Sequence, residues 1–247
     1  MMLLRPEWSA RFPELIIAQS SRQGGVSPYP NQALNLGWYT DDERQNVLEN
    51  RHRFARALGI RPEQLTGGHQ VHGNAVKQIT EVGECAGYDG FVTDQPDIVL
   101  SITIADCTPV LIYDPVRRVC GGAHAGWRGT VVQVARRTLE HMITAYQTQP
   151  ADCYAWIAAG ISRRYFEVSA DVAAQFAPHL VDGGYPNDKY RVDLKQANAE
   201  QLMDLGVPAQ KIDISPACTV ADNEHFFSYR KEKGRTGRML AVIGLLP

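Results

Sequence analysis

The sequence has few cysteines, no long apolar run and almost no net charge, and each absence argues against a class of protein. Its five cysteines show no C-x-x-C spacing, which makes a disulfide framework a poor expectation. No apolar stretch approaches the ~20 residues that a membrane-spanning helix needs. A net charge of -2 gives no electrostatic reason to expect binding to nucleic acid or to an anionic membrane.

A signal for export is also absent from the first residues. Residues 1–14 have neither the apolar run nor the small-residue cleavage site of a signal peptide. Because the cysteines also do not suggest disulfide pairing, we expect a protein of the reducing cytoplasm. The sequence does not distinguish a monomer from a homodimer.

Composition and apolar spacing predict one α/β domain over residues 1–247. Apolar residues make up 44% and charged residues 21%, as in soluble globular proteins, and this length buries a core without disulfides. Apolar, β-type runs predict strands at residues 14–20, 98–104, 109–113, 119–123, 154–158, 212–214 and 238–246. Helical spacing predicts helices after Thr40, after Gly129, and at residues 168–176 and 194–205. Many strands with few helices favour mixed sheets over a regular βαβ alternation.

The first predicted helix carries sequence signals at both ends. Thr40 and Glu43 have the spacing of an N-terminal capping box. Gly59 matches the glycine that commonly ends a helix. We therefore interpret this helix as part of the scaffold.

Residues 119–129 combine a predicted strand with the start of a helical pattern. An apolar run leads into His124, and Trp127 and Arg128 follow directly. Strand ends that meet helix starts are where α/β proteins place their chemistry. This segment is therefore the first place to look for a functional site.

Two other segments place reactive side chains at predicted strand ends or turns. Asp106 and Cys107 follow the buried strand predicted at residues 98–104. His72 comes three residues after His69, so in a strand the two rings would point to opposite faces, although the Gly-Asn pair after His72 allows a turn. A lone histidine is more often structural than a ligand, so His72 is only a candidate at this point.

His72, Cys107 and His124 together form a candidate catalytic metal site. Catalytic zinc sites gather three ligands from separate elements and leave a fourth position open. Two nitrogens and one thiolate suit Zn²⁺, and copper is a second option. On spacing alone, coincidence is the favoured interpretation. A rival interpretation makes Cys107 a nucleophile with His124 as its base and Asp106 or a backbone amide as helper, and a third makes Cys107 a small buried apolar residue.

Three polar residues are candidates for binding substrate or phosphate. Arg22 lies in a glycine-rich loop whose backbone can approach an anion closely, although a solvated arginine is favoured on spacing alone. Asn35 lies in a tight segment, and Arg128 lies near a helix start, where a guanidinium and helix amides can hold an anion together. Arg128 could equally pair with a carboxylate, and Arg230 and Arg238 have the same ambiguity.

These motifs resemble those of the YfiH-type family, long labelled polyphenol oxidases or laccase-domain proteins and more recently described as purine nucleoside phosphorylases. The most specific match is the His-Ala-Gly-Trp-Arg-Gly motif, which follows an Ala-Asp-Cys segment. The matching motifs span nearly the whole chain, at residues 21–27, 34–37, 70–73, 105–110, 124–129, 166–168, 218–219, 226–230 and 236–238. Ser169 departs from the family pattern, where many members carry glycine, and residues 161–164 also vary, so no role is assigned to them.

The resemblance implies a fold, a metal and an activity. It implies a four-layer αββα fold similar to cysteine-hydrolase-like toxin domains, with Zn²⁺ on His72, Cys107 and His124. It also implies phosphorolysis of adenosine, inosine, guanosine or methylthioadenosine, and hydrolytic deamination of adenosine. Deamination needs a proton carrier, and because the H-x-E motif of known zinc deaminases is absent, Asp106 is our substitute. Arg22 is our first choice for holding phosphate.

Three other functions compete with this one. A copper-dependent phenol oxidase would need several copper ions and about ten paired histidines, whereas the sequence has seven scattered ones. A hydrolase with Cys107 as nucleophile could edit a peptidoglycan precursor, as described for some bacterial relatives. A non-catalytic binding protein is disfavoured because polar, aromatic and arginine-rich motifs gather at predicted loop ends.

Overall fold

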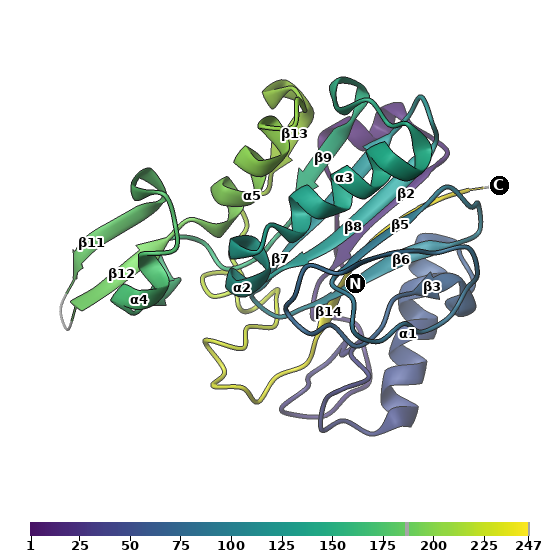
Figure 1. The fold of residues 1–247 in the computed structure, drawn as a ribbon. Coiled ribbons are helices and arrows are strands. Elements are labelled where there is room, and N and C mark those ends of the chain that lie inside the picture. The colour runs from purple at the N-terminus through teal and green to yellow at the C-terminus, as the bar shows by residue number, and fades with distance from the viewer. Residues whose placement is uncertain (186–187, 247) are drawn as a thin grey trace.

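Two β-sheets packed face to face form the centre of the molecule (Figure 1). The computed structural model describes residues 1–185 and 188–246. The five-stranded sheet contains, in spatial order, β1 (Leu3–Leu4), β2 (Leu15–Ser20), β14 (Met239–Leu245), β6 (Val99–Ile104) and β3 (Leu65–Thr66). The six-stranded sheet contains, in spatial order, β13 (Ile212–Ile214), β9 (Tyr154–Ile157), β7 (Thr108–Asp114), β8 (Val119–Ala125), β5 (Gly90–Thr93) and β4 (Val76–Gln78).

Helices cover the outer faces of both sheets. The α-helices are α1 (Arg44–Leu58), α2 (Trp127–Val131), α3 (Val134–Tyr146), α4 (Ala170–Ala173) and α5 (Leu194–Met203). Short 3-10 helices lie at Glu7–Arg11, Pro62–Gln64, Pro150–Asp152, Pro178–Leu180 and Ala209–Lys211. Within residues 1–185 and 188–246, no helix has the length and apolar character that crossing a membrane requires.

The side chains of β14 alternate between two apolar cores, one on each face of the five-stranded sheet. Met239, Ala241 and Ile243 point into the core between the two sheets, which they share with residues of β7 and β9. Leu240 and Val242 point the other way, toward α1. Because both faces of such a strand are buried, its sequence is apolar throughout rather than alternating.

The outer layers complete a four-layer order of helix, sheet, sheet and helix. On one side, Phe54 of α1 packs against Val242 and other apolar residues of the five-stranded sheet. On the other side, Leu139 of α3 and Leu202 of α5 pack against Ile112 and its neighbours in the six-stranded sheet. This arrangement confirms the expected α/β fold with mixed sheets, which contain both parallel and antiparallel pairs.

The strand predictions are confirmed, with bounds that agree to within two residues in every case. The helix predictions need correction at their ends. Gly59 does end α1, with φ of 75°. The predicted capping box is wrong, because Glu43 occupies the N-cap position and the Thr40 hydroxyl instead contacts the Asn35 amide and the Gly37 carbonyl.

The helical pattern after Gly129 is interrupted. The chain forms α2, breaks at Gln133, where φ is 63°, and continues as α3. The helix predicted at residues 168–176 is shorter than expected, because Val168 pairs with Tyr190 in a strand and only α4 is helical.

A third, small sheet projects from the side of the molecule and was not predicted (Figure 1). It contains β10 (Glu167–Val168), β12 (Lys189–Val192) and β11 (Val181–Tyr185), all antiparallel. A separate apolar cluster that includes Phe166, Val192 and Leu194 joins it to the start of α5. We call residues 161–185 and 188–192 the side module, because its inner edge helps to line the candidate site.

Candidate functional site

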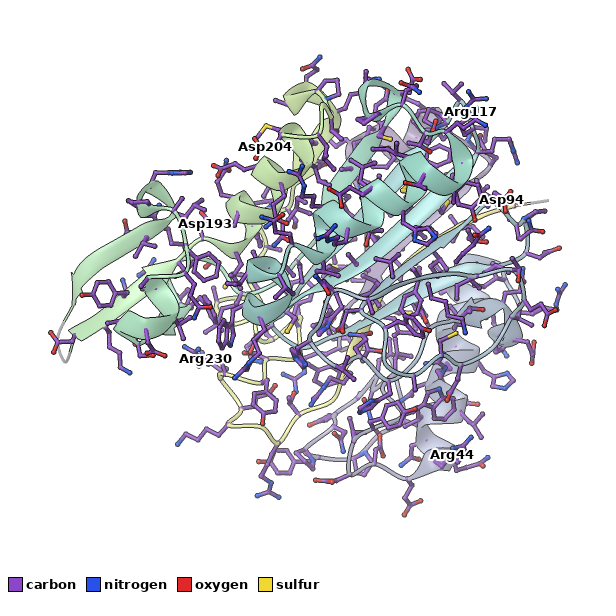
Figure 2. The ribbon with its side chains drawn as sticks, viewed as in Figure 1. Arg44, Asp94, Arg117, Asp193, Asp204 and Arg230 are labelled. Carbon is purple, nitrogen blue, oxygen red and sulfur yellow. The ribbon has the colours of Figure 1, made fainter. Side chains whose placement is uncertain are left out.

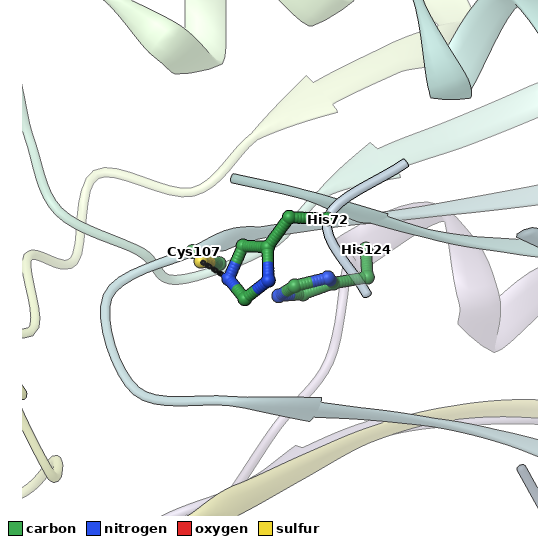
Figure 3. A group of neighbouring side chains, drawn as sticks. All are labelled: His72, Cys107 and His124. Atoms are coloured by element: carbon green, nitrogen blue, oxygen red, sulfur yellow. Dashed lines mark hydrogen bonds between the residues drawn. The ribbon is translucent and has the colours of Figure 1, made fainter. Parts of the chain in front are cut away.

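His72, Cys107 and His124 meet at one end of the six-stranded sheet (Figure 3). His72 lies in the bend after β3, Cys107 in the turn between β6 and β7, and His124 near the end of β8. Their potential ligand atoms all lie within 4.8 Å of one another, and Cys107 Sγ is 4.0 Å from His72 Nε2. The structure therefore brings together three side chains that are far apart in the sequence.

Local backbone geometry explains why these side chains can approach. In the antiparallel register of β7 and β8, Pro109 is opposite His124, so Cys107 lies just beyond the paired ends. His72 has φ of 62°, which confirms that the chain turns there instead of continuing as a strand. Gly126 leaves the necessary space, because a Cβ atom at this position would lie 2.9 Å from Cys107 Sγ.

Asp89 is a fully buried residue of this site whose role could not be predicted from the sequence. Its Oδ1 lies 2.8 Å from His124 Nδ1, and because a carboxylate only accepts, the ring donates at Nδ1 and turns Nε2 toward the cluster. The backbone N–H groups of His72 and Gly73 also donate to Asp89, at 2.9 Å and 2.7 Å. One carboxylate thus orients both histidine-bearing segments.

The surroundings of the cluster favour the thiolate form of Cys107 and the protonated form of His124. Burial raises the pKa of the Cys107 thiol, but the charge and hydrogen bonds of His124 and the contact with His72 outweigh burial and lower the pKa to about 6. Burial lowers the pKa of His124, but Cys107 and Asp89 outweigh this effect and raise it to about 9. At Cys120, burial is the largest effect and raises the pKa of the thiol above its usual value. Cys107 is therefore the reactive type of cysteine, whereas Cys120 is the inert type.

The cluster opens into a cavity of about 500 Å³. This volume lies within the range of small-molecule sites, roughly 300–1,000 Å³. Besides the cluster, the lining comprises Gly37, Tyr39, Gly68, His69, Gln70, Thr103, Ala105, Asp106, Ile161, Phe166, Tyr229, Arg230 and Arg238. The side module and the loop before β14 therefore form walls that the sheets alone would not provide.

Asp106 lines this cavity but is held by its neighbours. Its two carboxylate oxygens accept hydrogen bonds from the Thr219 hydroxyl and the Arg230 backbone N–H, each at 2.6 Å. Its backbone has φ of 88°, and its carbonyl accepts from Ile161 N–H at 2.8 Å. These contacts fix the turn that presents Cys107.

The structure does not bring Arg22 to the cluster. Its guanidinium pairs with Glu232 at 2.9 Å and donates to the carbonyls of Gln32 and Asn223. It lines a separate hollow of about 320 Å³. All three guanidinium nitrogens of Arg22 thus donate to other groups of the protein.

Asn35 and Arg128 are also outside the lining of the cavity. Asn35 is buried, and its side chain contacts Thr40, Asp42 and the backbone N–H of Arg238. Arg128 is exposed, with its guanidinium carbon 4.3 Å from the centre of the Trp127 ring. Asn35 contacts the cavity wall indirectly, because its Oδ1 accepts hydrogen bonds from the backbone N–H groups of Gly37 and Arg238.

Fold and site together define a four-layer α/β protein with a His-Cys-His candidate metal centre. Residues 16–246 match the family described as "Multi-copper polyphenol oxidoreductase laccase", and the chain belongs to this family. This result confirms the YfiH-type resemblance, because a crystal structure of YfiH from Bacillus licheniformis has a TM-score of 0.89 and 30% identity, covering 97% of this chain and 94% of that one.

Other relatives carry names that refer to nucleosides. A "Purine nucleoside phosphorylase" of Deinococcus radiodurans is 40% identical and covers 95% of this chain and 92% of its own length. "Purine nucleoside phosphorylase YlmD" of Bacillus subtilis is 32% identical, with 94% and 89% covered. The crystal structure of YlmD from Geobacillus stearothermophilus has a TM-score of 0.91 at 32% identity, with 96% and 93% covered.

Proposed function

We propose that this protein is a purine nucleoside phosphorylase whose active site is the cavity containing His72, Cys107 and His124. The names of the relatives support the reaction class. The observation that carries the proposal is the position of the three potential ligands at a cavity of about 500 Å³, large enough for a nucleoside and phosphate together.

We further propose that the three residues hold zinc, and their geometry fits this ion. Tetrahedral zinc with Zn–S of about 2.3 Å and Zn–N of about 2.0–2.1 Å places its ligand atoms roughly 3.6 Å apart. Cys107 Sγ and His72 Nε2 are 4.0 Å apart, and all three ligand atoms lie within 4.8 Å, so small rotations bring them into range. Asp89 on the far nitrogen of His124 is the outer partner that zinc-binding histidines usually have.

The reaction sets clear demands on the protein. An oxygen of phosphate forms a bond to C1′ of the ribose while the bond from C1′ to the purine nitrogen breaks, and the departing purine takes the electron pair and a proton. A bound zinc ion would supply Lewis acidity at its open position. The protein must hold both reactants and exclude water, and Asp89 keeps His124 in one orientation throughout.

The individual substrates and a second activity are also part of the proposal. It includes adenosine, inosine, guanosine and methylthioadenosine, with deamination of adenosine as a second activity. Asp106 is the candidate proton carrier for deamination, but it would have to release one of its two hydrogen bonds first. If Asp106 carries the proton, Asp106→Asn should abolish inosine formation in protein that still holds its metal; unchanged inosine formation would remove it.

Metal content and product formation test the main proposal together. Wild type and Cys107→Ser are compared for zinc per chain and for purine released from adenosine in phosphate buffer. We expect wild type to hold one zinc and release adenine, and the variant to lose both. A metal-free wild type that is inert toward nucleosides would reject the proposal.

A second candidate function is a cysteine hydrolase, which would act on a substrate such as a peptidoglycan precursor. It is favoured by the order of Cys107, His124 and Asp89, which matches nucleophile, base and orienting carboxylate. It predicts activity that survives a chelator and a covalent adduct on Cys107 during turnover. A phenol oxidase has less support, because the described residues contain a single group of three His, Cys or carboxylate ligands.

All five cysteines are free in the structure, which supports a reducing compartment, and we therefore propose a cytoplasmic location.

A further inference from the structure

Two arginines of the cavity are anchored in the same way. Arg230 donates from Nη1 to the carbonyls of Tyr165 and Glu167, at 3.3 Å and 3.1 Å. Arg238 donates from Nη1 to the carbonyls of Thr236 and Gly237, at 2.8 Å and 3.0 Å. Backbone carbonyls thus accept hydrogen bonds from one nitrogen, Nη1, of each guanidinium. Because these acceptors are uncharged, they do not neutralise its positive charge.

An aromatic ring supports each guanidinium from one side. The guanidinium carbon of Arg230 lies 5.5 Å from the centre of the Phe166 ring, and that of Arg238 lies 5.6 Å from the Tyr229 ring. An aromatic contact of this kind restrains an arginine while leaving its N–H edge available for in-plane hydrogen bonds. Figure 2 labels Arg230, which lies where the loop before β14 meets the side module.

The remaining N–H donors of both arginines have no acceptor among the residues that the structure describes. Across residues 1–185 and 188–246, no hydrogen bond or salt bridge joins Nε or Nη2 of Arg230 or Arg238. Asp106 is the sole carboxylate among the described lining residues, and both its oxygens already accept other hydrogen bonds. Arg22 is the contrasting case, since all its nitrogens are used and Glu232 neutralises its charge.

We propose that Arg230 and Arg238 form a two-arginine clamp for inorganic phosphate inside the cavity. This inference rests on the proposed phosphorylase function, because phosphate is then the second substrate. Guanidinium groups match the geometry of phosphate oxygens and bind them through paired N–H donors. Both residues line the same cavity as Cys107, and Arg238 is close enough to interact electrostatically with Cys107 and Asp106.

The clamp is also linked to the cluster through the backbone. The N–H of Arg230 donates to Asp106, the residue before Cys107. Its side chain reaches the carbonyls on either side of Phe166 in the side module. The side module therefore helps to position one of the two phosphate-binding arginines, which assigns a role to the unpredicted small sheet.

Separate Michaelis constants for phosphate and nucleoside test the clamp. Arg230→Gln and Arg238→Gln are each expected to raise the KM for inorganic phosphate by roughly 10- to 100-fold, since a charge-assisted contact is lost. The KM for adenosine should change by less than about 3-fold. Lysine at either position should recover part of the phosphate affinity, because it keeps the charge but not the paired donors. Arg53→Gln, on the exposed face of α1, is the matched control with unchanged constants.

The outcomes separate failure of the clamp from failure of the phosphorylase proposal. If wild type phosphorolyses adenosine but both glutamine variants keep the wild-type KM for phosphate, the clamp is wrong and the function stands. A rise in the adenosine KM alone would also overturn it, because the arginines would then hold the nucleoside. If wild type forms no sugar phosphate, the proposed function fails, and binding of phosphate followed by ³¹P NMR then tests the clamp separately. Phosphate binding that is present in wild type and lost in the Arg230→Gln/Arg238→Gln double variant would support the clamp. Equal binding in both proteins, or no binding to wild type, would reject it.

Discussion

The two ends of the cavity are built from different kinds of structure. The end with the cluster lies where interior strands of the six-stranded sheet begin and end, and His124 and Asp89 are almost completely buried there, although His72 comes from an exposed bend. The end with the arginines comes from the loop before β14 and the side module, where Tyr229 is 55% exposed. Strands and their ends hold atoms closely, as a metal site requires, whereas loops can adapt to substrates that enter and leave.

This difference predicts that changes at the cluster end will be more damaging than changes at the arginine end. Under the proposed function, displacing one ligand atom at the cluster removes the metal and with it the reaction. At the clamp, one lost contact weakens the binding of one substrate. The predictions below test this order from the largest expected effect to the smallest.

Removing a ligand should have the largest effect. His72→Ala, Cys107→Ala and His124→Ala should each lose zinc and lower turnover by at least roughly 100-fold, above the range for loss of an outer partner. Metal analysis and adenosine phosphorolysis measure both effects. His52→Ala, on the exposed surface of α1, is the control. Full zinc and full activity in any one of the three variants would remove that residue from the ligand set.

Removing the orienting carboxylate should have the next largest effect. Asp89→Asn keeps the size of the side chain but loses the charge that holds His124 Nδ1–H and the backbone N–H of Gly73. We expect zinc affinity to fall by roughly 10- to 100-fold, measured by competition with a chelating dye. Asp94→Asn, at the far end of β5, should bind zinc normally. Unchanged affinity in Asp89→Asn would show that His124 needs no partner.

Filling the space beside the cluster should have a smaller effect. In Gly126→Ala the new Cβ would lie 2.9 Å from Cys107 Sγ and 3.1 Å from a carbon of the His72 ring. Such overpacking costs about 1–3 kcal/mol, so zinc affinity should fall by roughly tenfold. The control is Gly122→Ala in β8, where the nearest atoms are 3.4 Å away. Equal zinc affinities for Gly126→Ala and wild type would contradict the tight packing.

The smallest expected effect is a shift in the pH dependence of Cys107 alkylation in metal-free protein. In metal-free protein, the pKa of Cys107 near 6 means that the reactive thiolate dominates above pH 6 and the thiol below it. Alkylation of Cys107 by iodoacetamide, followed by mass spectrometry, should therefore reach half its maximal rate near pH 6. In His124→Ala the midpoint should move to higher pH, because the positive neighbour is gone. A midpoint near 8.5 in the parent protein would rule out the thiolate–imidazolium pair.

Much of the fold could be predicted from local sequence patterns. The apolar runs of β6 and β14 were sufficient because strands buried on both faces leave a continuous signature. The small sheet escaped prediction, since β11 contains Asp182 and two glycines, residues that usually indicate turns. Its stability comes from packing against α5 and its surroundings, which no local pattern encodes.

The site was predictable only in part, for a related reason. Motifs indicated His72, Cys107 and His124, but the role of Asp89 depends on a hydrogen bond to a residue 35 positions away. Arg22 and Arg238 are similar in sequence, each within two residues of a glycine in a loop, and differ in whether a carboxylate pairs with the guanidinium. Such partners are set by tertiary structure, so the sequence favoured Arg22 for phosphate and left Arg128, Arg230 and Arg238 undecided.

One measurement tests the proposed phosphorylase most directly. Zinc-loaded protein is incubated with adenosine and phosphate labelled with ¹⁸O at all four oxygens, and the sugar product is analysed by mass spectrometry. Phosphorolysis predicts a ribose phosphate that retains the full label, released together with free adenine. Unlabelled free ribose, or no release of adenine at all, would contradict the proposed reaction at the His72, Cys107 and His124 site.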